Sequence, residues 1–440
     1  MSHRLALTIG IAWLLAGAAY AQTMAEHQHE MPAAMPGAGV GEEDLPPLGT
    51  GPSVQMTGAL GNYSMMRDAS GTSWQPESST MEGIHGIYDD WATMVHGYAS
   101  LVYDHQGGRR GDNKTFSESM IMGMAQRMVG DGTLTLRGML SLDPLMGKSG
   151  YPLLLQTGET ADGVKPLIDH QHPHDFLMEL AGVYSVPVAQ DSSAFLYVGY
   201  PGEPALGPPT FMHRFSGMES PEAPISHHWL DSTHITYGVV TGGIVYGSWK
   251  VEGSIFNGRE PDQQRWDFDP LRLDSGSGRI SWNPTENWAF QASYGFIKAP
   301  EQLEPNVNQH RITASAMYNQ KLEHGNWQTT LAWGQNNLQP GETLNAYLLE
   351  SAVGWYAHTV FVRAENTEKD ELFPAGDPLH GRTFDVSKFS LGYVYDIPVG
   401  EHFSLGLGAL GSFYVLPSAV RRAYGSSPTS YMLFTRVKLK

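Results

Sequence analysis

The feature that most constrains this chain is a two-residue alternation of apolar and polar side chains, which recurs from about residue 93 onward. Residues 288–296 read Trp-Ala-Phe-Gln-Ala-Ser-Tyr-Gly-Phe, so one face is mainly aromatic and the other is small or polar. Residues 327–335 alternate in the same way, and so do residues 245–257, with Val245, Gly247, Trp249, Val251 and Ile255 on one face. Successive side chains of a strand point to opposite faces, so each segment predicts a strand with one apolar side.

About sixteen such segments are expected, within a range of 14–18, because an even strand number is typical of a barrel and one hairpin is easily misjudged. They are 93–104, 116–128, 132–143, 175–186, 193–200, 232–241, 245–257, 276–283, 286–297, 309–320, 325–335, 343–352, 357–366, 386–396, 401–415 and 428–439. Many carry aromatic residues near their ends, as membrane-interface girdles do. The alternation therefore predicts an all-β fold, a transmembrane antiparallel β-barrel, rather than a soluble sandwich.

The connections between these segments are expected to alternate between short and long. Short ones lie at 129–132, 189–192, 283–287, 324–326 and 398–401, and long ones at 144–174, 201–231, 258–275, 298–308, 367–385 and 416–427. Short periplasmic turns and long outer loops are typical of outer-membrane barrels. We therefore expect the chain in the cell outer membrane, in contact with its lipid, as a monomer or a homotrimer.

The chain before residue 93 is of a different kind. Residues 1–21 combine a basic start, an apolar run and Ala19-Tyr20-Ala21, which predicts a secretory signal peptide; a membrane anchor helix is the alternative. Residues 22–92 contain many Met, His, Pro and Gly residues, so we expect a mostly irregular, flexible segment. Within it, Ser73-Trp74-Gln75-Pro76-Glu77 suits either a small plug in the barrel or an ordered approach to the first strand. Residues 93–440 are the expected barrel.

Composition excludes some classes of protein and site. The chain has no cysteine, which removes disulfides and thiolate metal ligands. The formal net charge of −18 argues against a nucleic-acid partner, because nucleic-acid binding needs a basic face.

A cluster of histidine and aspartate, Asp169-His170-Gln171-His172-Pro173-His174-Asp175, is the strongest candidate for chemistry. Neutral imidazole and carboxylate bind Zn(II), Cu(II) or Ni(II), and alternate residues of an extended segment share one side. The next long loop brings His213, His227 and His228, so a composite metal site is one interpretation. The other is a structural network in which the rings pair with Asp169, Asp175 and Asp231.

A row of methionines is the second candidate. Met120, Met122 and Met124 share the lumen-facing side of segment 116–128, and Met139 follows on the next strand. Thioethers are soft ligands that suit Cu(I) or Ag(I). The alternative is that these side chains pack against a plug or an inward loop.

Charged residues at inward positions form the third group. They are expected to line the lumen, where they either tune which ions pass or pair across strands and hold a plug. The group comprises Arg137, Asp143, Lys250, Glu252, Arg279, Arg311, Glu350, Arg363 and Glu365.

Enzyme motifs are scarce. Ser226-His227-His228 and Asp231-Ser232-Thr233-His234 contain the residue types of a serine hydrolase, but they do not follow a known nucleophile elbow. No catalytic residues are assigned and no enzyme activity is expected, although a hydrolase at the barrel rim is kept as an alternative.

Several motifs resemble a group of largely uncharacterised proteobacterial outer-membrane proteins that accompany copper and other heavy-metal resistance systems. They are Ser73–Glu77, Gly150–Thr160, His170–Asp175, Gly202–Pro208, Phe211–Arg214 and Asn257–Asp262. The resemblance covers about residues 70–440, and it implies a barrel with a connection to metals. It transfers no site residues.

These observations predict a porin-like channel connected with metal-ion handling or resistance, with metal ions or small solutes as its cargo. An alternative is a barrel that sequesters metal and conducts little, and a rim hydrolase is the second. The bound metal would be a divalent ion or copper.

Overall fold

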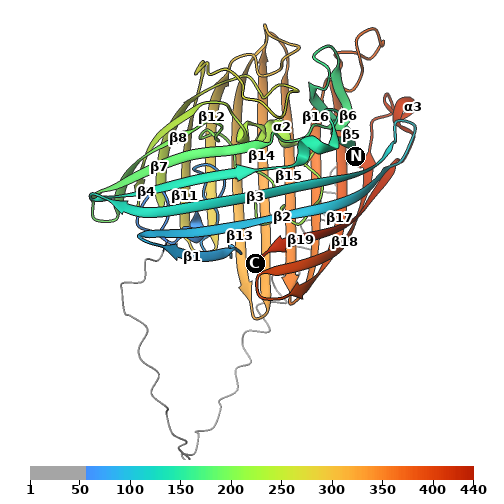
Figure 1. The fold of residues 1–440 in the computed structure, drawn as a ribbon. Helices are drawn as coiled ribbons and strands as arrows, with labels where there is room; N and C mark the ends of the chain where they lie inside the picture. Colours follow the sequence, from blue (N-terminus) through green and yellow to red (C-terminus); the bar gives the residue numbers. More distant parts are fainter. Residues whose placement is uncertain (1–55) are drawn as a thin grey trace, which may run out of the picture. The chain divides into compact units, whose positions relative to one another are not determined.

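The computed structural model describes residues 56–440, and the predicted signal peptide and residues 22–55 lie outside the described residues. Sixteen antiparallel strands form one closed barrel, in which β19 pairs with β2 to complete the ring (Figure 1). The strands are β2 (Trp91–Gln106), β3 (Asn113–Val129), β4 (Gly132–Leu140), β7 (Leu177–Ala189), β8 (Ser192–Gly199), β9 (Val239–Tyr246), β10 (Trp249–Phe256), β11 (Ser275–Thr285), β12 (Trp288–Ile297), β13 (Asn308–Leu322), β14 (Gly325–Gln339), β15 (Thr343–Trp355), β16 (His358–Lys369), β17 (Phe384–Val399), β18 (Phe403–Val415) and β19 (Thr429–Leu439). The predicted fold class is confirmed.

Smaller elements lie between and before these strands. They are η1 (Met65–Arg67), β1 (Ile84–Tyr88), η2 (Asp143–Met146), β5 (Tyr151–Thr160), β6 (Pro166–Gln171), α2 (His227–Leu230), η3 (Ser232–His234) and α3 (Arg421–Tyr424). β1 pairs with the first part of β2, and β5 and β6 form a separate two-stranded hairpin. Among the described residues, no helix is long and apolar enough to cross a membrane.

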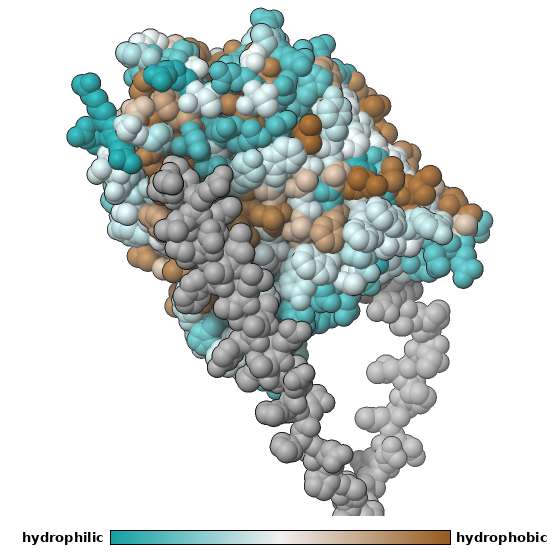
Figure 2. Space-filling view, turned by 180° about the vertical axis from the view of Figure 1, so that it is seen from behind, coloured by the Kyte–Doolittle hydropathy of each residue, from teal (hydrophilic) through white to brown (hydrophobic). Residues whose placement is uncertain are grey.

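The outward faces of the strands are apolar, as the alternation predicts. Large apolar side chains such as Leu331, Leu433 and Val251 are more than half exposed to the surroundings. Figure 2 shows apolar residues over the strands of one face and hydrophilic residues at the top of that view. An exterior of this kind is unfavourable in water and suits the hydrocarbon of a bilayer.

One hairpin differs from its prediction. The strands were expected at 232–241 and 245–257, but β9 begins at Val239 and the turn falls at Gly247 and Ser248. Gly247 has φ +55°, a conformation that glycine adopts without strain. The shift reverses the expected sides at the end of β9, so Val245 is buried inside and Tyr246 points outward.

The expected alternation of short and long connections also needs a correction. At the turn end of the barrel, where β3 meets β4, every connection between barrel strands is short. At the opposite loop end, the lengths vary: β14 and β15 are joined by residues 340–342 alone, whereas 200–238 join β8 to β9. The two longest connections, 141–176 and 200–238, contain segments that fold into the barrel, so their length follows from filling the lumen.

The lumen is filled by the chain itself. Residues 56–83 lie against the inner wall, where Arg137 donates to Gly71 O at 2.6 Å and Asn283 donates to Gln75 O at 2.8 Å. Residues 200–238, which we call the inward loop, cross to the opposite wall, where Arg214 Nε donates to Glu350 at 2.6 Å. The β5–β6 hairpin completes the filling, because Tyr151 stacks on Phe116 and accepts from Ala223 N.

Candidate functional site

Five histidine rings meet inside the barrel. His172 and His174 follow β6, His227 and His228 belong to α2, and His234 ends η3. The ring centroids of His227 lie 5.5 Å from His228, 5.2 Å from His234 and 6.4 Å from His172. His174 joins through His234, at 5.3 Å. We call these five residues the imidazole cluster; all of them are buried.

Four of the five rings are held at Nδ1 by an oxygen atom. The acceptors are Pro173 O for His172 (3.3 Å), Asp143 Oδ2 for His174 (2.8 Å), Asp231 Oδ1 for His227 (2.7 Å) and Asp231 O for His234 (2.9 Å). An oxygen acceptor at Nδ1 fixes the tautomer that leaves the lone pair on Nε2.

The Nε2 atoms of all five rings are buried without a hydrogen-bond partner. His172 Nε2 lies 3.2 Å from Glu159 Oε1, but not in the direction of a hydrogen bond. Ligand atoms of His172, His227 and His228 lie within 4.8 Å of one another, so small side-chain movements bring all three onto one ion. Buried polar atoms are ordinarily paired, and the unpaired set here has the chemistry of a metal site.

Burial lowers the pKa of His172, His227, His228 and His234, so these four rings are neutral at physiological pH. Burial, together with the neighbouring rings of His227 and His174, lowers the pKa of His172 to about 3. Burial likewise lowers the pKa of His228 well below its usual range. A neutral imidazole is the form that binds a metal ion.

Local structure explains why the rings converge. Phe211 packs against His174, His227 and His234 with ring centroids 5.4–6.3 Å apart. Gly158 leaves room for His228, because a side-chain carbon there would lie 2.0 Å from the ring, and its φ of +108° favours glycine. Arg214 anchors the inward loop by pairing with both Glu350 and Asp231.

Several predicted ligands lie outside the imidazole cluster. Asp169 accepts from Leu155 N at 2.8 Å and pairs with Arg110 at 3.3 Å, and Asp175 pairs with Arg265 at 3.1 Å. His170 is half-buried, and its partner on β5 is Pro152. In the structural network that was the alternative interpretation, Asp169, Asp175 and Asp231 pair with histidine rings; here Asp169 and Asp175 pair with arginines, and Asp231 alone of the three pairs with a ring, that of His227.

The sequence predicted a different location for His234 of the imidazole cluster and for Asp143, which holds His174. His234 was expected to begin a strand, and Asp143 was expected at the end of one, as an inward charge. The chain instead leaves the barrel wall after Leu140 until β7 begins at Leu177, and again after Gly199 until β9 begins at Val239, so both residues belong to lumen-filling segments. The closeness of His227 and His234 in the sequence was the feature from which their contact could have been predicted.

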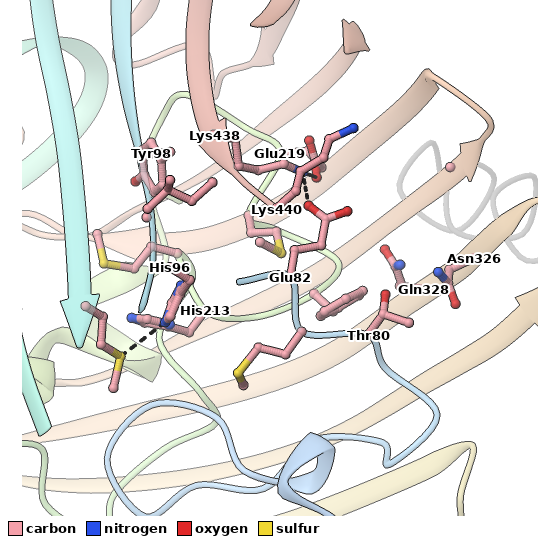
Figure 3. Close-up of a pocket in the computed structure, with 18 of the residues that line it drawn as sticks. Thr80, Glu82, His96, Tyr98, His213, Glu219, Asn326, Gln328, Lys438 and Lys440 are labelled. Carbon is pink, nitrogen blue, oxygen red and sulfur yellow. Dashed lines mark hydrogen bonds and ion pairs between the residues drawn. The ribbon is translucent and has the colours of Figure 1, made fainter. Parts of the chain in front are cut away.

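The methionine row points inward, toward the turn end. Met120, Met122 and Met124 are buried and line a chamber of about 540 Å³, together with His96 and His213 (Figure 3). His96 was not singled out in the sequence, although Met94, His96 and Tyr98 alternate along β2. His213, predicted with the metal ligands, therefore lies in this chamber rather than in the imidazole cluster.

The inward charges are buried and paired. Their partners are Glu179 for Arg137, Glu252 for Lys250 and Arg279, Glu350 for Arg363, Ser226 for Glu365, and Ser232 and Asn336 for Arg311. Arg279 and Lys250 also donate to Thr72 of the N-terminal segment. In this conformation these residues hold chain inside the barrel.

The serine of the hydrolase alternative, Ser226, is hydrogen-bonded to a carboxylate and not to a histidine. The Ser226 hydroxyl donates to Glu365 Oε1 at 2.8 Å, and it is buried inside the barrel rather than placed at the rim. A serine nucleophile needs its hydroxyl against the imidazole of a base. The arrangement around Ser226 therefore gives no support to a rim hydrolase.

Comparison with known proteins shows similarity in the fold alone. No protein-family model matches the sequence, and no curated protein matches it. OprB of Pseudomonas putida matches with a TM-score of 0.50 and 7% identity, over 80% of this chain and 94% of that chain. OmpF of Salmonella typhi matches with a TM-score of 0.49 and 10% identity, over 81% and 100%. An anion-selective porin from Comamonas acidovorans gives a TM-score of 0.47 and 11% identity, over 79% and 99%. The chain has a porin-like barrel fold, and nothing in these matches links it to copper or heavy-metal resistance.

Proposed function

We propose that this protein is an outer-membrane barrel that binds a divalent transition-metal ion, such as Zn(II), Ni(II) or Cu(II), at the imidazole cluster. The observation that carries the proposal is the set of five buried Nε2 atoms that lack hydrogen-bond partners. Imidazole ligands oriented by carboxylate and carbonyl oxygens suit these metals. The apolar exterior and the closed ring of strands support the outer-membrane location.

An acidic depression gives the ion access from the loop end. It has a volume of about 60 Å³, and its lining includes His228, Glu260, Glu301 and Glu371. Burial raises the pKa of Glu260 to about 7, so its negative charge increases between pH 6 and pH 8. Burial also raises the pKa of Glu371 to about 8 and that of Glu301 well above its usual range, so the negative charge that attracts a cation to this mouth increases with pH.

The filled lumen favours binding over free diffusion in this conformation. Lys250, Glu350 and Lys388 point inward yet are fully buried, whereas charges that select permeating ions lie against water. The protein therefore corresponds to a metal-binding barrel of low conductance. A conduit remains the second candidate, favoured by the porin-like fold and by the chamber that opens at the turn end.

Metal titration of the purified protein tests the proposal. We expect the wild type to bind Zn(II) and the variant His227→Ala with His228→Ala to bind one ion fewer. His310 and His358 lie on the outer face, bonded to Tyr294 and Tyr393, so His310→Ala with His358→Ala is the matched control. Equal stoichiometry in the two double variants would refute the assignment.

Cellular role and assembly remain predictions. If the barrel handles metal in the cell, loss of the imidazole cluster changes growth under Zn(II), Ni(II) or Cu(II) stress, and the outer-face double variant does not.

Light scattering in detergent distinguishes the monomer from the homotrimer.

A further inference from the structure

A second set of potential ligands lies at the turn end of the same lumen. The chamber of about 540 Å³ is lined by thioethers from three separate parts of the chain. These are Met65 and Met81 of the N-terminal segment, Met120, Met122 and Met124 of β3, and Met212 and Met218 of the inward loop. Most of these methionines pack with Met94, Met139 and Met178 in one core cluster, and they also present their side chains to the open space of the chamber.

Two imidazoles contact methionine sulfur atoms: His96 contacts Met122 of the chamber lining, and His213 contacts Met139, the residue on β4 that pairs with Met122. His96 Nε2 lies 3.3 Å from Met122 Sδ, and His213 Nε2 lies 3.3 Å from Met139 Sδ. The rings of His96 and His213 are neighbours in the chamber, with centroids 5.9 Å apart (Figure 3). Two nitrogen and two sulfur donors thus come together, from β2, β3, β4 and the inward loop.

We propose that this chamber is a second metal site, selective for a soft monovalent ion such as Cu(I) or Ag(I). Thioethers bind these ions well, whereas harder divalent ions prefer nitrogen and oxygen ligands. All four donors are uncharged when the imidazoles are neutral, and a monovalent ion needs less charge compensation than a divalent one when buried. The imidazole cluster has nitrogen ligands alone and suits borderline divalent ions instead.

The two sites are adjacent but independent. Phe211 packs on the imidazole cluster, while Met212 and His213 line the chamber, so one turn of the inward loop separates them. The turn is held by hydrogen bonds from His213 N and Arg214 N to Thr210 O. The second site does not rest on the proposed function, because its donors are other residues.

Access is from the turn end. The lining there includes Asn326 at the start of β14, Tyr356 in the turn between β15 and β16, and Lys440. Glu82 and Glu219 line the same mouth, and both contact Lys438 (Figure 3). A soft ion arriving from this end meets carboxylates before it reaches the sulfur atoms.

Silver binding by the full-length protein tests the second site, with Ag(I) as the probe. The test variant is Met122→Leu with Met139→Leu, which keeps side-chain volume and removes both sulfur atoms. The control is Met128→Leu, because Met128 lies on the same strand, is 63% exposed beside the β3–β4 turn, and does not line the chamber. All proteins carry Met24→Leu, Met31→Leu and Met35→Leu, which removes background binding by the N-terminal thioethers.

We expect the test variant to bind one Ag(I) fewer, or to bind it at least about tenfold more weakly, while Met128→Leu matches the parent. X-ray absorption of the parent should show sulfur neighbours around silver. His227→Ala with His228→Ala should keep full Ag(I) binding, which separates this test from that of the imidazole cluster. Unchanged Ag(I) binding in the test variant, with heat-modifiable gel migration showing that it is folded, would overturn the proposal.

Discussion

Asp231 holds His227 through a hydrogen bond of 2.7 Å between Asp231 Oδ1 and His227 Nδ1. Burial alone would raise the pKa of Asp231, but the adjacent His227 and Arg214 outweigh it and hold that pKa at about 2. The carboxylate is therefore charged at neutral pH, and it orients the ring so that Nε2 faces the centre of the imidazole cluster. Because of this contact, His227 is a ligand with a fixed orientation and not only a buried histidine.

Asp231→Asn should weaken Zn(II) binding about 10- to 100-fold, the usual cost of losing a group that orients a metal ligand. Glu350 still pairs with Arg214 in this variant, so the inward loop keeps an anchor. Isothermal titration in detergent measures the affinity. Asp162→Asn, on the exposed tip of the β5–β6 hairpin, is the control and should bind Zn(II) like the wild type. Equal affinities for the two variants would show that Asp231 has no positioning role.

Acid should release the inward loop from the last strand. Burial opposes ionisation of Glu219, but Arg436 and Lys438 outweigh it and hold its pKa at about 2. A carboxyl group with a lowered pKa stabilises the fold above its ordinary pKa of about 4.5. That stabilisation, roughly 3 kcal/mol by the shift, is lost as the pH falls from 4.5 to 2. The melting temperature should therefore fall over this range.

In Glu219→Gln, the fall between pH 4.5 and pH 2 should be smaller, and the melting temperature at pH 7 should be lower than in the wild type. Glu401→Gln is a suitable control because Glu401 is exposed in the turn between β17 and β18. A wild-type melting temperature that does not change over this range would contradict the account of this ion pair.

Loosening the N-terminal segment should open the barrel. Arg137 donates to Gly71 O and Arg279 donates to Thr72 Oγ1, so Arg137→Ala with Arg279→Ala removes two contacts that hold this segment. We expect channel openings in planar bilayers to become several-fold more frequent than in the wild type. Arg109→Ala with Arg422→Ala, two exposed loop residues, provides the control. Conductance that is high in the wild type and unchanged in the double variant would instead support an open porin.

The outer face should tolerate a charge poorly. Leu331 lies in the middle of β14 and is 59% exposed on the apolar exterior. If this face contacts hydrocarbon, Leu331→Lys should destabilise the folded barrel by about 2–4 kcal/mol in lipid vesicles. Leu145→Lys, at an exposed position of η2 between β4 and β5, should be nearly neutral. Equal unfolding free energies of the two variants would argue against a membrane-facing belt at β14.

The sequence predicted the wall of the barrel better than its contents. Alternation in segments such as 288–296 and 327–335 is a local signal, because each strand has one face toward the exterior. The interior depends on contacts between distant residues, and neither the Arg214–Glu350 pair nor the Arg137–Gly71 contact has a local signature. Residues 232–238 were assigned to the wall for this reason.

The same distinction applies to the imidazole cluster. The motif at 169–175 and His227-His228 were found because histidines are close together in the sequence. Which of them converge depends on how two lumen-filling segments meet, so His170 and His213 were grouped with residues that lie elsewhere. His96 was missed because a single histidine in an alternating strand carries no metal-binding pattern.

Crystals of the purified protein grown with Zn(II), measured across the zinc absorption edge, test the central claim most directly. We predict an anomalous peak inside the barrel at about 2.0–2.1 Å from Nε2 of His227, the usual Zn–N distance. His172 or His228 should complete the site from the neighbouring positions. A zinc-containing structure in which the imidazole cluster is empty, with the ion bound elsewhere, would contradict the account.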